Sequence, residues 1–288
     1  MFRLRIHLRA LALAFLAGTL FLCAPAQGQN VDTLLDQSFH AMYNLKFEDA
    51  LRTAEQAKAL DKDDPMPWVA QASALLFREF DRLHILRSEM FSSDAAFDAR
   101  PASSWVEPNR KQFEGALNGA EKIAHTRMER NKNDVRALFA LTLADGMRAD
   151  DAALISKHNL AALGYTKTAT GHAEKLLSLS PEYYDAYIAT GMGKYIIGGK
   201  PAPVRWMLRL GGLKGNQDEG LKELKVVAEH GRYLAPFARI LLAFDDLRHK
   251  NAVEARRKFI LLHDQFPANP LFQQEIAKCD QPSPASGP

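Results

Sequence analysis

The sequence predicts an all-α protein made of antiparallel helix pairs, and two patterns carry this prediction. Apolar residues recur at spacings of three and four along most of the chain, as in Phe237, Ile240, Leu241, Phe244 and Leu247. Such spacing lays an apolar stripe along one side of a helix, and the stripe must bury against a neighbour. Turn-forming residues punctuate these runs, and no stretch shows the strict alternation that is typical of a strand.

The predicted helices follow one another from residue 31. Pro65, Pro181 and Pro267 each separate two helices, because proline lacks the N–H that a helix interior needs but fits at a helix start. Asp134 is predicted to be the N-cap of a helix, and Asn269 precedes the proline that begins the last one. The predicted pairs are 31–45 with 47–61, 66–90 with 109–131, 134–148 with 152–179, 182–198 with 216–230, and 234–249 with 252–266, followed by a closing helix at 270–278.

Residues 91–108 interrupt the helix pairs and are predicted to be an irregular insertion. The insertion carries Phe91, Phe97 and Trp105 among turn-forming residues. Long irregular segments are uncommon in compact domains and are often functional. The favoured interpretation is that the aromatic rings pin the insertion onto the second helix pair; the alternative is a lid over a ligand.

Residues 1–26 have the layout of a secretory signal peptide. Three arginines are followed by an apolar run and by a small-residue cleavage site that ends at Ala26. The apolar run is too short to span a bilayer. We therefore expect cleavage after Ala26 and export to the periplasm or the exterior, with a helical-repeat domain at 31–278 and a disordered tail at 279–288.

Charge and cysteine content restrict the function further. The chain has 37 lysines and arginines against 34 acidic residues, and the leader contains three of the arginines and no acid, which leaves 34 of each sign in the mature chain. This balance gives no argument for a nucleic-acid partner. Cys23 belongs to the leader, so Cys279 is alone in the mature chain and no internal disulfide is expected.

Three segments resemble tetratricopeptide repeats, namely 43–50, 173–191 and 255–270. In the second, Tyr187 takes the large aromatic position of a repeat and Gly191 takes the small position four residues later. Helices in such repeats approach closely, which requires glycine or alanine where they cross. The repeat ends are not spaced at the family's period of about 34 residues, so the repeats are extended or divergent. The likeness is to exported bacterial proteins of this family.

The resemblance implies a right-handed superhelix whose concave face binds peptides or protein segments. That face would be lined by the first helix of each pair. On this basis we expect an exported, non-catalytic scaffold that takes a protein or peptide segment in its groove. The residues that match the groove positions are Arg136, Phe139, Leu143, Asp185, Ile188, Met192 and Tyr195.

A catalytic or cofactor-dependent function is not expected from the motifs. Of nine histidines one belongs to the leader, and no pair among the others has metal-ligand spacing on one helix. The glycines near 191–199 and 211–215 follow no predicted strand and lack the Gly-Lys-Ser/Thr ending of a phosphate loop. We therefore predict that the protein binds no metal and no cofactor and is not an enzyme. The alternative is a catalytic site assembled from groove residues, which sequence motifs do not reveal.

Residues 198–215 form a second predicted insertion, in which cations and apolar residues interleave. Arg205, Trp206 and Arg209 are its candidate functional residues, with Lys200 and Lys214 at its ends. A basic amphipathic stretch with a tryptophan can lie at a membrane surface or hold an acidic partner. The favoured interpretation is that Trp206 and the leucines plug the superhelix while the charges face water, since tryptophan usually buries its ring.

Overall fold

The computed structural model describes residues 30–91, 95 and 99–281. The predicted signal peptide, Phe97 and residues 282–288 of the predicted tail lie outside the described residues. Every regular element in the described part of the chain is a helix, which confirms the all-α prediction. Over these same ranges, no helix is both long and apolar enough to cross a membrane.

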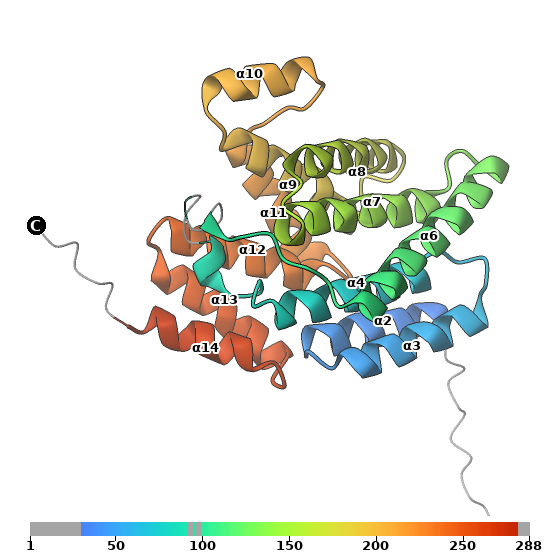
Figure 1. The fold of residues 1–288 in the computed structure, drawn as a ribbon, viewed down its shortest axis with the longest axis horizontal. Coiled ribbons are helices and arrows are strands. Elements are labelled where there is room, and N and C mark those ends of the chain that lie inside the picture. The colour runs from blue at the N-terminus through green and yellow to red at the C-terminus, as the bar shows by residue number, and fades with distance from the viewer. Residues whose placement is uncertain (1–29, 92–94, 96–98, 282–288) are drawn as a thin grey trace, which may run out of the picture. The chain divides into compact units, whose positions relative to one another are not determined.

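The helices form five successive antiparallel pairs and a closing helix, as predicted (Figure 1). The two helices of each pair contact each other, and each pair contacts the next. The pairs are α2 (Val31–Tyr43) with α3 (Phe47–Leu60), α4 (Met66–Arg82) with α6 (Glu107–Arg130), α7 (Val135–Asp150) with α8 (Asn159–Leu179), α9 (Tyr187–Gly198) with α11 (Gln217–His230), and α12 (Ala235–Arg248) with α13 (Ala252–Gln265), and α14 (Pro270–Cys279) closes the array. An additional helix, α10 (Ala202–Leu210), lies in the connection between α9 and α11.

Two of the helix starts follow from side-chain capping. The Asp134 carboxylate accepts a hydrogen bond from the backbone N–H of Ala137 at 2.9 Å, and the Asn269 side chain accepts one from Leu271 at 2.9 Å. These bonds satisfy N–H groups that the first turn of a helix leaves without a backbone partner. The sequence predicts both helix starts, and both are confirmed.

Several helix boundaries differ from the prediction: α8 begins at Asn159 and not at residue 152, α9 begins at Tyr187 and not at residue 182, and two breaks lie at left-handed residues. α4 ends at Arg82 and not at residue 90, because His84 adopts a left-handed backbone with φ of 57°. α7 continues into a π-helical turn, Asp151–Ile155, and the break falls at Lys157, whose φ is 56°. Neither break contains glycine or proline, so the usual turn signals are missing from the sequence at both places.

Glycine permits the close crossing of α9 and α11. A Cβ atom on Gly191 would lie 3.2 Å from the backbone oxygen of Gly220, and a Cβ atom on Gly220 would lie 2.6 Å from the backbone oxygen of Gly191. Only residues without a side chain allow two backbones to approach this closely. The predicted role of Gly191 at a helix crossing is confirmed.

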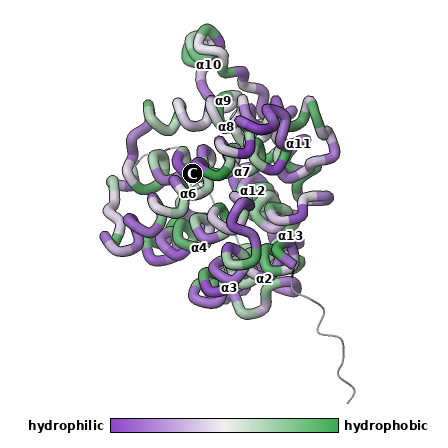
Figure 2. Tube along the Cα trace, turned by 90° about the vertical axis from the view of Figure 1, so that its right-hand side faces the viewer, coloured by the Kyte–Doolittle hydropathy of each residue, from purple (hydrophilic) through white to green (hydrophobic). Residues whose placement is uncertain are grey.

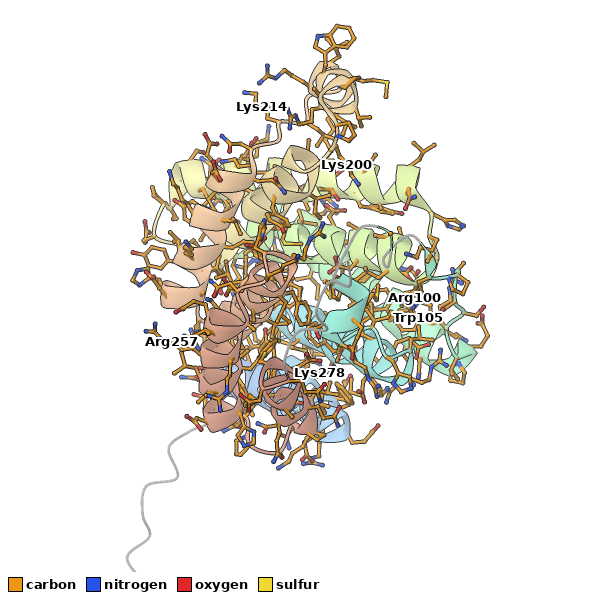
Figure 3. The ribbon with its side chains drawn as sticks, turned by 90° about the vertical axis from the view of Figure 1, so that its left-hand side faces the viewer. Arg100, Trp105, Lys200, Lys214, Arg257 and Lys278 are labelled. Carbon is orange, nitrogen blue, oxygen red and sulfur yellow. The ribbon has the colours of Figure 1, made fainter. Side chains whose placement is uncertain are left out.

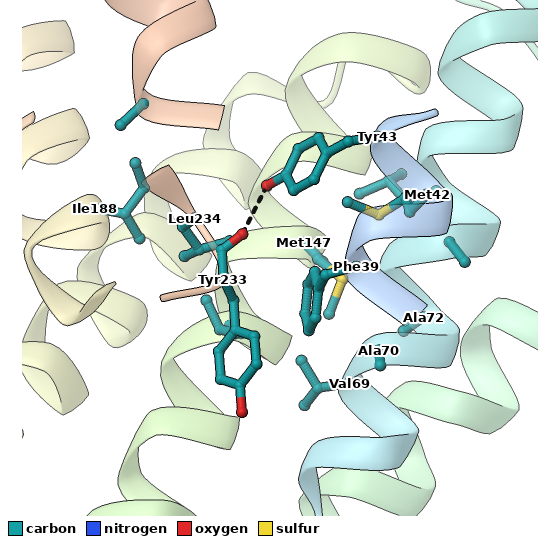
Figure 4. Packing of buried hydrophobic residues seen from close by; sticks show 14 of the residues in the cluster. Phe39, Met42, Tyr43, Val69, Ala70, Ala72, Met147, Ile188, Tyr233 and Leu234 are labelled. Atoms are coloured by element: carbon teal, nitrogen blue, oxygen red, sulfur yellow. Dashed lines mark hydrogen bonds between the residues drawn. The ribbon is translucent and has the colours of Figure 1, made fainter. Parts of the chain in front are cut away.

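The inner face of the array is filled by contacts between the first and last pairs. The Tyr43 hydroxyl donates to the backbone oxygen of Tyr233 at 3.0 Å (Figure 4). Phe77 packs edge-on against Phe237 with ring centroids 5.8 Å apart. The side-chain amide of Asn269 donates to the backbone oxygen of Tyr43 at 2.9 Å. Side chains from α2 and α4 therefore meet those around α12 and α14 and form one continuous core.

Candidate functional site

Four of the seven predicted groove residues are core residues. Phe139, Leu143, Asp185 and Ile188 are all buried. The ring of Phe139, for example, packs 4.8 Å from that of Tyr183. The resemblance implies an accessible concave face, whereas in this structure these four side chains are packed inside the fold.

Asp185 caps a helix. Its carboxylate accepts hydrogen bonds from the backbone N–H groups of Arg232 at 3.0 Å, Tyr233 at 3.2 Å and Leu234 at 2.9 Å, just before α12 begins. Burial raises the pKa of this carboxyl group, and the three N–H donors oppose the rise. The side chain therefore fixes the turn into α12.

Arg136 belongs to an ion-pair network. Its guanidinium lies 2.5 Å from Asp64 and 2.9 Å from Asp32, which connects α7 to α2 and to the loop before α4. Arg232 extends the network, at 2.8 Å from Asp36 and 3.4 Å from Asp32. Because the Arg136 guanidinium already faces two carboxylates, the network serves to join helix pairs.

The remaining two groove candidates are half-buried on α9. The hydroxyl of Tyr195 donates to Asp245 at 2.5 Å and thereby links α9 to α12. Met192 packs against the margin of the core. All seven predicted groove residues are thus engaged in packing or polar contacts within the fold.

Accessible hollows occur instead on both sides of α13. One hollow of about 540 Å³ lies between α13 and α14, and another of about 610 Å³ lies between α13 and the helices α11 and α12. Both are open, and Arg257 and Leu261 line both of them. α13 is therefore a ridge with a depression on either side.

The crest of this ridge is a stripe of three exposed residues, Val253, Arg257 and Leu261, which we call the α13 stripe. Val253 is 76% exposed, Leu261 is 53% exposed, and the Arg257 side chain is 75% exposed. Residues four apart lie on the same face of a helix, so the stripe alternates apolar, cationic and apolar groups along one line. Figure 3 shows Arg257 at the edge of the molecule.

The charge around the α13 stripe is predominantly positive. Lys225, Arg239, Arg256, Arg257 and Lys258 line the two hollows, against Glu229, Glu254 and Asp280. Arg256 is 2.6 Å from Asp280, whereas Arg257 is 3.7 Å from Glu254. An exposed ion pair contributes little, so the Arg257 charge remains available to a partner.

The first insertion is pinned to the domain by its aromatic residues. The Trp105 ring stacks on Phe113 of α6 at 4.8 Å, and its Nε1 donates to Asp151 at 2.7 Å. This contact confirms the predicted pin on the second helix pair for Trp105. Phe91 differs, because it stacks on Phe244 of α12, 5.0 Å between centroids.

The second insertion does not plug the array, and the favoured interpretation of Trp206 is wrong. Residues 202–210 form the helix α10, none of whose residues is buried. Trp206 is 66% exposed, and Arg205 and Arg209 also lie on this unburied helix. The apolar residues of α10 have helical spacing in the sequence, but the glycines and prolines around them favour an irregular segment.

In the described part of the chain, no group of three or more His, Cys, Asp or Glu side chains is placed to hold a metal ion.

Comparison with known proteins gives a structural match and no match by sequence. No family model and no curated protein matches the chain. A solved structure that does match is that of a thermophilic TPR protein from Thermus thermophilus. It is 16% identical, covers 81% of this chain and 90% of that protein, and has a TM-score of 0.41. The antiparallel helix pairs are seen directly in the structure and do not depend on this match.

Proposed function

We propose that this protein is a non-catalytic scaffold that binds a segment of another protein, and that the segment docks along the α13 stripe. The single observation that carries the proposal is the ridge formed by Val253, Arg257 and Leu261 with an open hollow on each side. Exposed apolar residues arranged in a patch are typical of interaction sites. Small-molecule sites are usually enclosed, whereas both of these hollows are open to solvent.

The chemistry of the stripe indicates the kind of segment. Val253 and Leu261 offer apolar contacts that are about two helical turns apart, and Arg257 offers a cation between them. A segment with an acidic residue flanked by large apolar side chains matches this order. Arginine also suits such a site because its planar fork binds a carboxylate through two hydrogen bonds.

A library of random peptides displayed on phage tests the proposal. We expect selection on the wild-type protein to enrich peptides with acidic residues beside large apolar ones. The double variant Arg257→Glu, Leu261→Ser should bind an enriched peptide at least about tenfold more weakly, which is a loss of about 1.4 kcal/mol. Both substituted side chains are exposed, so the fold is retained, as circular dichroism can verify.

Leu60→Ser is the matched control, because Leu60 is 56% exposed on α3. This variant should bind the enriched peptide as the wild type does. The proposal fails if no peptide is enriched, or if the α13 double variant binds the enriched peptides with unchanged affinity.

Export is part of the proposed function. The supporting observation is the layout of residues 1–26, with three arginines, an apolar run and a small-residue end at Ala26. N-terminal sequencing of the protein recovered from its native host should give Gln27 as the first residue. Recovery of the protein with Met1 in place would refute cleavage.

A further inference from the structure

The helix α10 exposes large apolar side chains that a protein normally buries. Trp206, Met207 and Leu210 are 66%, 62% and 70% exposed. Figure 2 shows α10 at the margin of the helical domain, apart from the other labelled helices. Such a cluster of adjacent exposed apolar groups is unfavourable in water and indicates a surface that becomes covered by something else.

The residues of α10 are segregated by face. Trp206 and Leu210 are four apart, with Met207 beside them, so they share one side of the helix. Arg205 and Arg209 are also four apart and lie along the neighbouring side. This is the arrangement of an amphipathic helix with a cationic border.

Charge in this segment has one sign. Residues 200–214 contain four cations, Lys200, Arg205, Arg209 and Lys214, and no acidic residue. Lys200 and Lys214 lie where the segment joins the domain (Figure 3). The segment therefore presents four positive charges around its apolar side chains and is complementary to an anionic surface.

Contacts where the two ends of the segment meet hold α10 in its projecting position. A Cβ atom on Gly215 would lie 2.4 Å from the backbone nitrogen of Gly198, so the two ends of the segment meet at a neck that requires glycine. The backbone N–H of Asn216 donates to the backbone oxygen of Lys194 at 3.0 Å. Arg205 donates to the backbone oxygen of Gly198 at 3.0 Å and ties the helix to the same neck.

We propose that α10 binds the surface of an anionic lipid bilayer. Trp206, Met207 and Leu210 enter the interface between headgroups and acyl chains, while Arg209 beside them contacts anionic headgroups and the other three cations add to the electrostatic attraction. A projecting convex helix suits a fluid surface that deforms around it, whereas a protein partner would have to supply a groove. Because α10 has nine residues, it lies on the membrane and does not span it.

Fluorescence titration with vesicles tests this proposal, using the full chain and variants that all keep Trp206. The vesicles contain either phosphatidylcholine alone or equal parts of phosphatidylcholine and phosphatidylglycerol. We expect the emission of Trp206 to shift to shorter wavelength with the anionic vesicles only, and the shift to weaken as salt is added. A parallel titration of Trp206→Phe gives the contribution of Trp68 and Trp105, which is subtracted. Since every variant keeps the N-terminal residues, a shift caused by those residues alone would be unchanged in the α10 variants.

Three variants separate the contributions. Arg209→Ser should weaken binding about fivefold, since each cation near an anionic membrane contributes about 1 kcal/mol. Met207→Ser with Leu210→Ser should weaken it by about tenfold or more through lost apolar burial. Leu160→Ser, which changes an 86% exposed leucine on α8, should have no effect.

Several outcomes would overturn the proposal. One is the absence of any shift with anionic vesicles at low salt. Another is an equal shift with phosphatidylcholine alone, and a third is unchanged binding by the arginine variant. A shift caused by soluble polyglutamate and not by vesicles would assign α10 to an acidic protein partner instead of lipid.

Discussion

Each of the two insertions of this protein contains a tryptophan, which is buried in the first insertion and exposed in the second. Trp105 in the first insertion is 7% exposed, whereas Trp206 in the second is 66% exposed. Both lie in segments that interrupt helix pairs, and both are preceded by proline within a few residues. Residue type therefore does not decide whether an insertion packs onto the domain.

The difference lies in the partners that each ring finds. Trp105 has an aromatic ring to stack on, Phe113, and a carboxylate to receive its N–H, Asp151. Arg100 fastens the same insertion by donating to the backbone oxygens of Leu83 at 3.2 Å and Leu154 at 3.0 Å. Trp206, by contrast, is flanked by cations, and burying them without partners would cost more than burying the ring gains. In this protein the partners available to each ring, and not the residue type, account for the difference in burial.

Replacement of each tryptophan by alanine is the strongest test of this contrast. Trp105→Ala should lower the free energy of unfolding by about 3–5 kcal/mol, because it leaves a cavity beside Phe113 and removes a hydrogen bond from Asp151. Trp206→Ala should change it by less than about 0.5 kcal/mol, as is usual at exposed positions. Urea denaturation followed by circular dichroism measures both values. Equal destabilisation by the two substitutions would show that Trp206 is packed in solution.

Two glycines show the same contrast between a position that is packed against a neighbouring helix and one that is open. Gly191→Leu should destabilise the protein by about 1–3 kcal/mol, because the added side chain meets the backbone of α11 at the crossing. Gly164→Ala should stabilise it by about 0.5–1 kcal/mol, since nothing lies within 4 Å of an added Cβ and alanine favours the helix. Thermal unfolding measures both effects: the melting temperature should fall for Gly191→Leu and rise for Gly164→Ala. A Gly191→Leu protein with an unchanged melting temperature would remove Gly191 from the α9–α11 crossing.

A smaller effect is expected at the half-buried carboxyl group of Asp145. Burial, followed by the charge of Glu121, raises the pKa of Asp145 from 3.8 to about 6, against the opposing influence of Arg148 and His125. His172 also faces this carboxylate, with its Nε2 3.8 Å from Asp145 Oδ2. Because the folded state favours the protonated form, stability falls as pH rises from about 4 to about 6, and the loss persists at neutral pH.

Asp145→Asn removes this loss. Its melting temperature should exceed that of the wild type by about 1–2 °C at pH 7, after allowance for solvent screening of a partly exposed group, and the two should converge below about pH 4. Differential scanning calorimetry across this pH range measures the effect. The explanation is contradicted if the melting temperature of Asp145→Asn, minus that of the wild type, is lower at pH 7 than at pH 4.

Local signals in the sequence predicted local structure well. The capping residue Asp134, the proline at the start of α14 and the small residue Gly191 each act through neighbours that helical geometry fixes, and all three are confirmed. The five helix pairs follow from such signals. The breaks at His84 and Lys157 were missed because they depend on backbone conformations that these residues do not usually adopt.

The candidate sites depend on contacts that no local pattern encodes. The hydrogen bond from Tyr43 to Tyr233 joins residues that are 190 positions apart and helps to fill the face that the family resemblance had left open. Phe139 and Ile188 are likewise core residues, and Phe139 packs on Tyr183, which is 44 positions away. The α13 stripe has helical spacing that is visible in the sequence, but its exposure follows from α13 belonging to the last pair, where only α14 covers its outer side.

Acrylamide quenching of tryptophan fluorescence tests the contrast between the two insertions most directly. The wild-type protein and Trp206→Phe are titrated under identical conditions, and the difference between them is the emission of Trp206. We predict that Trp206 accounts for most of the quenchable emission, and that the remaining emission resists acrylamide because Trp105 is buried and Trp68 is half-buried. If Trp206→Phe is quenched as readily as the wild type, Trp206 is shielded in solution, and both the contrast and the exposed helix α10 are contradicted.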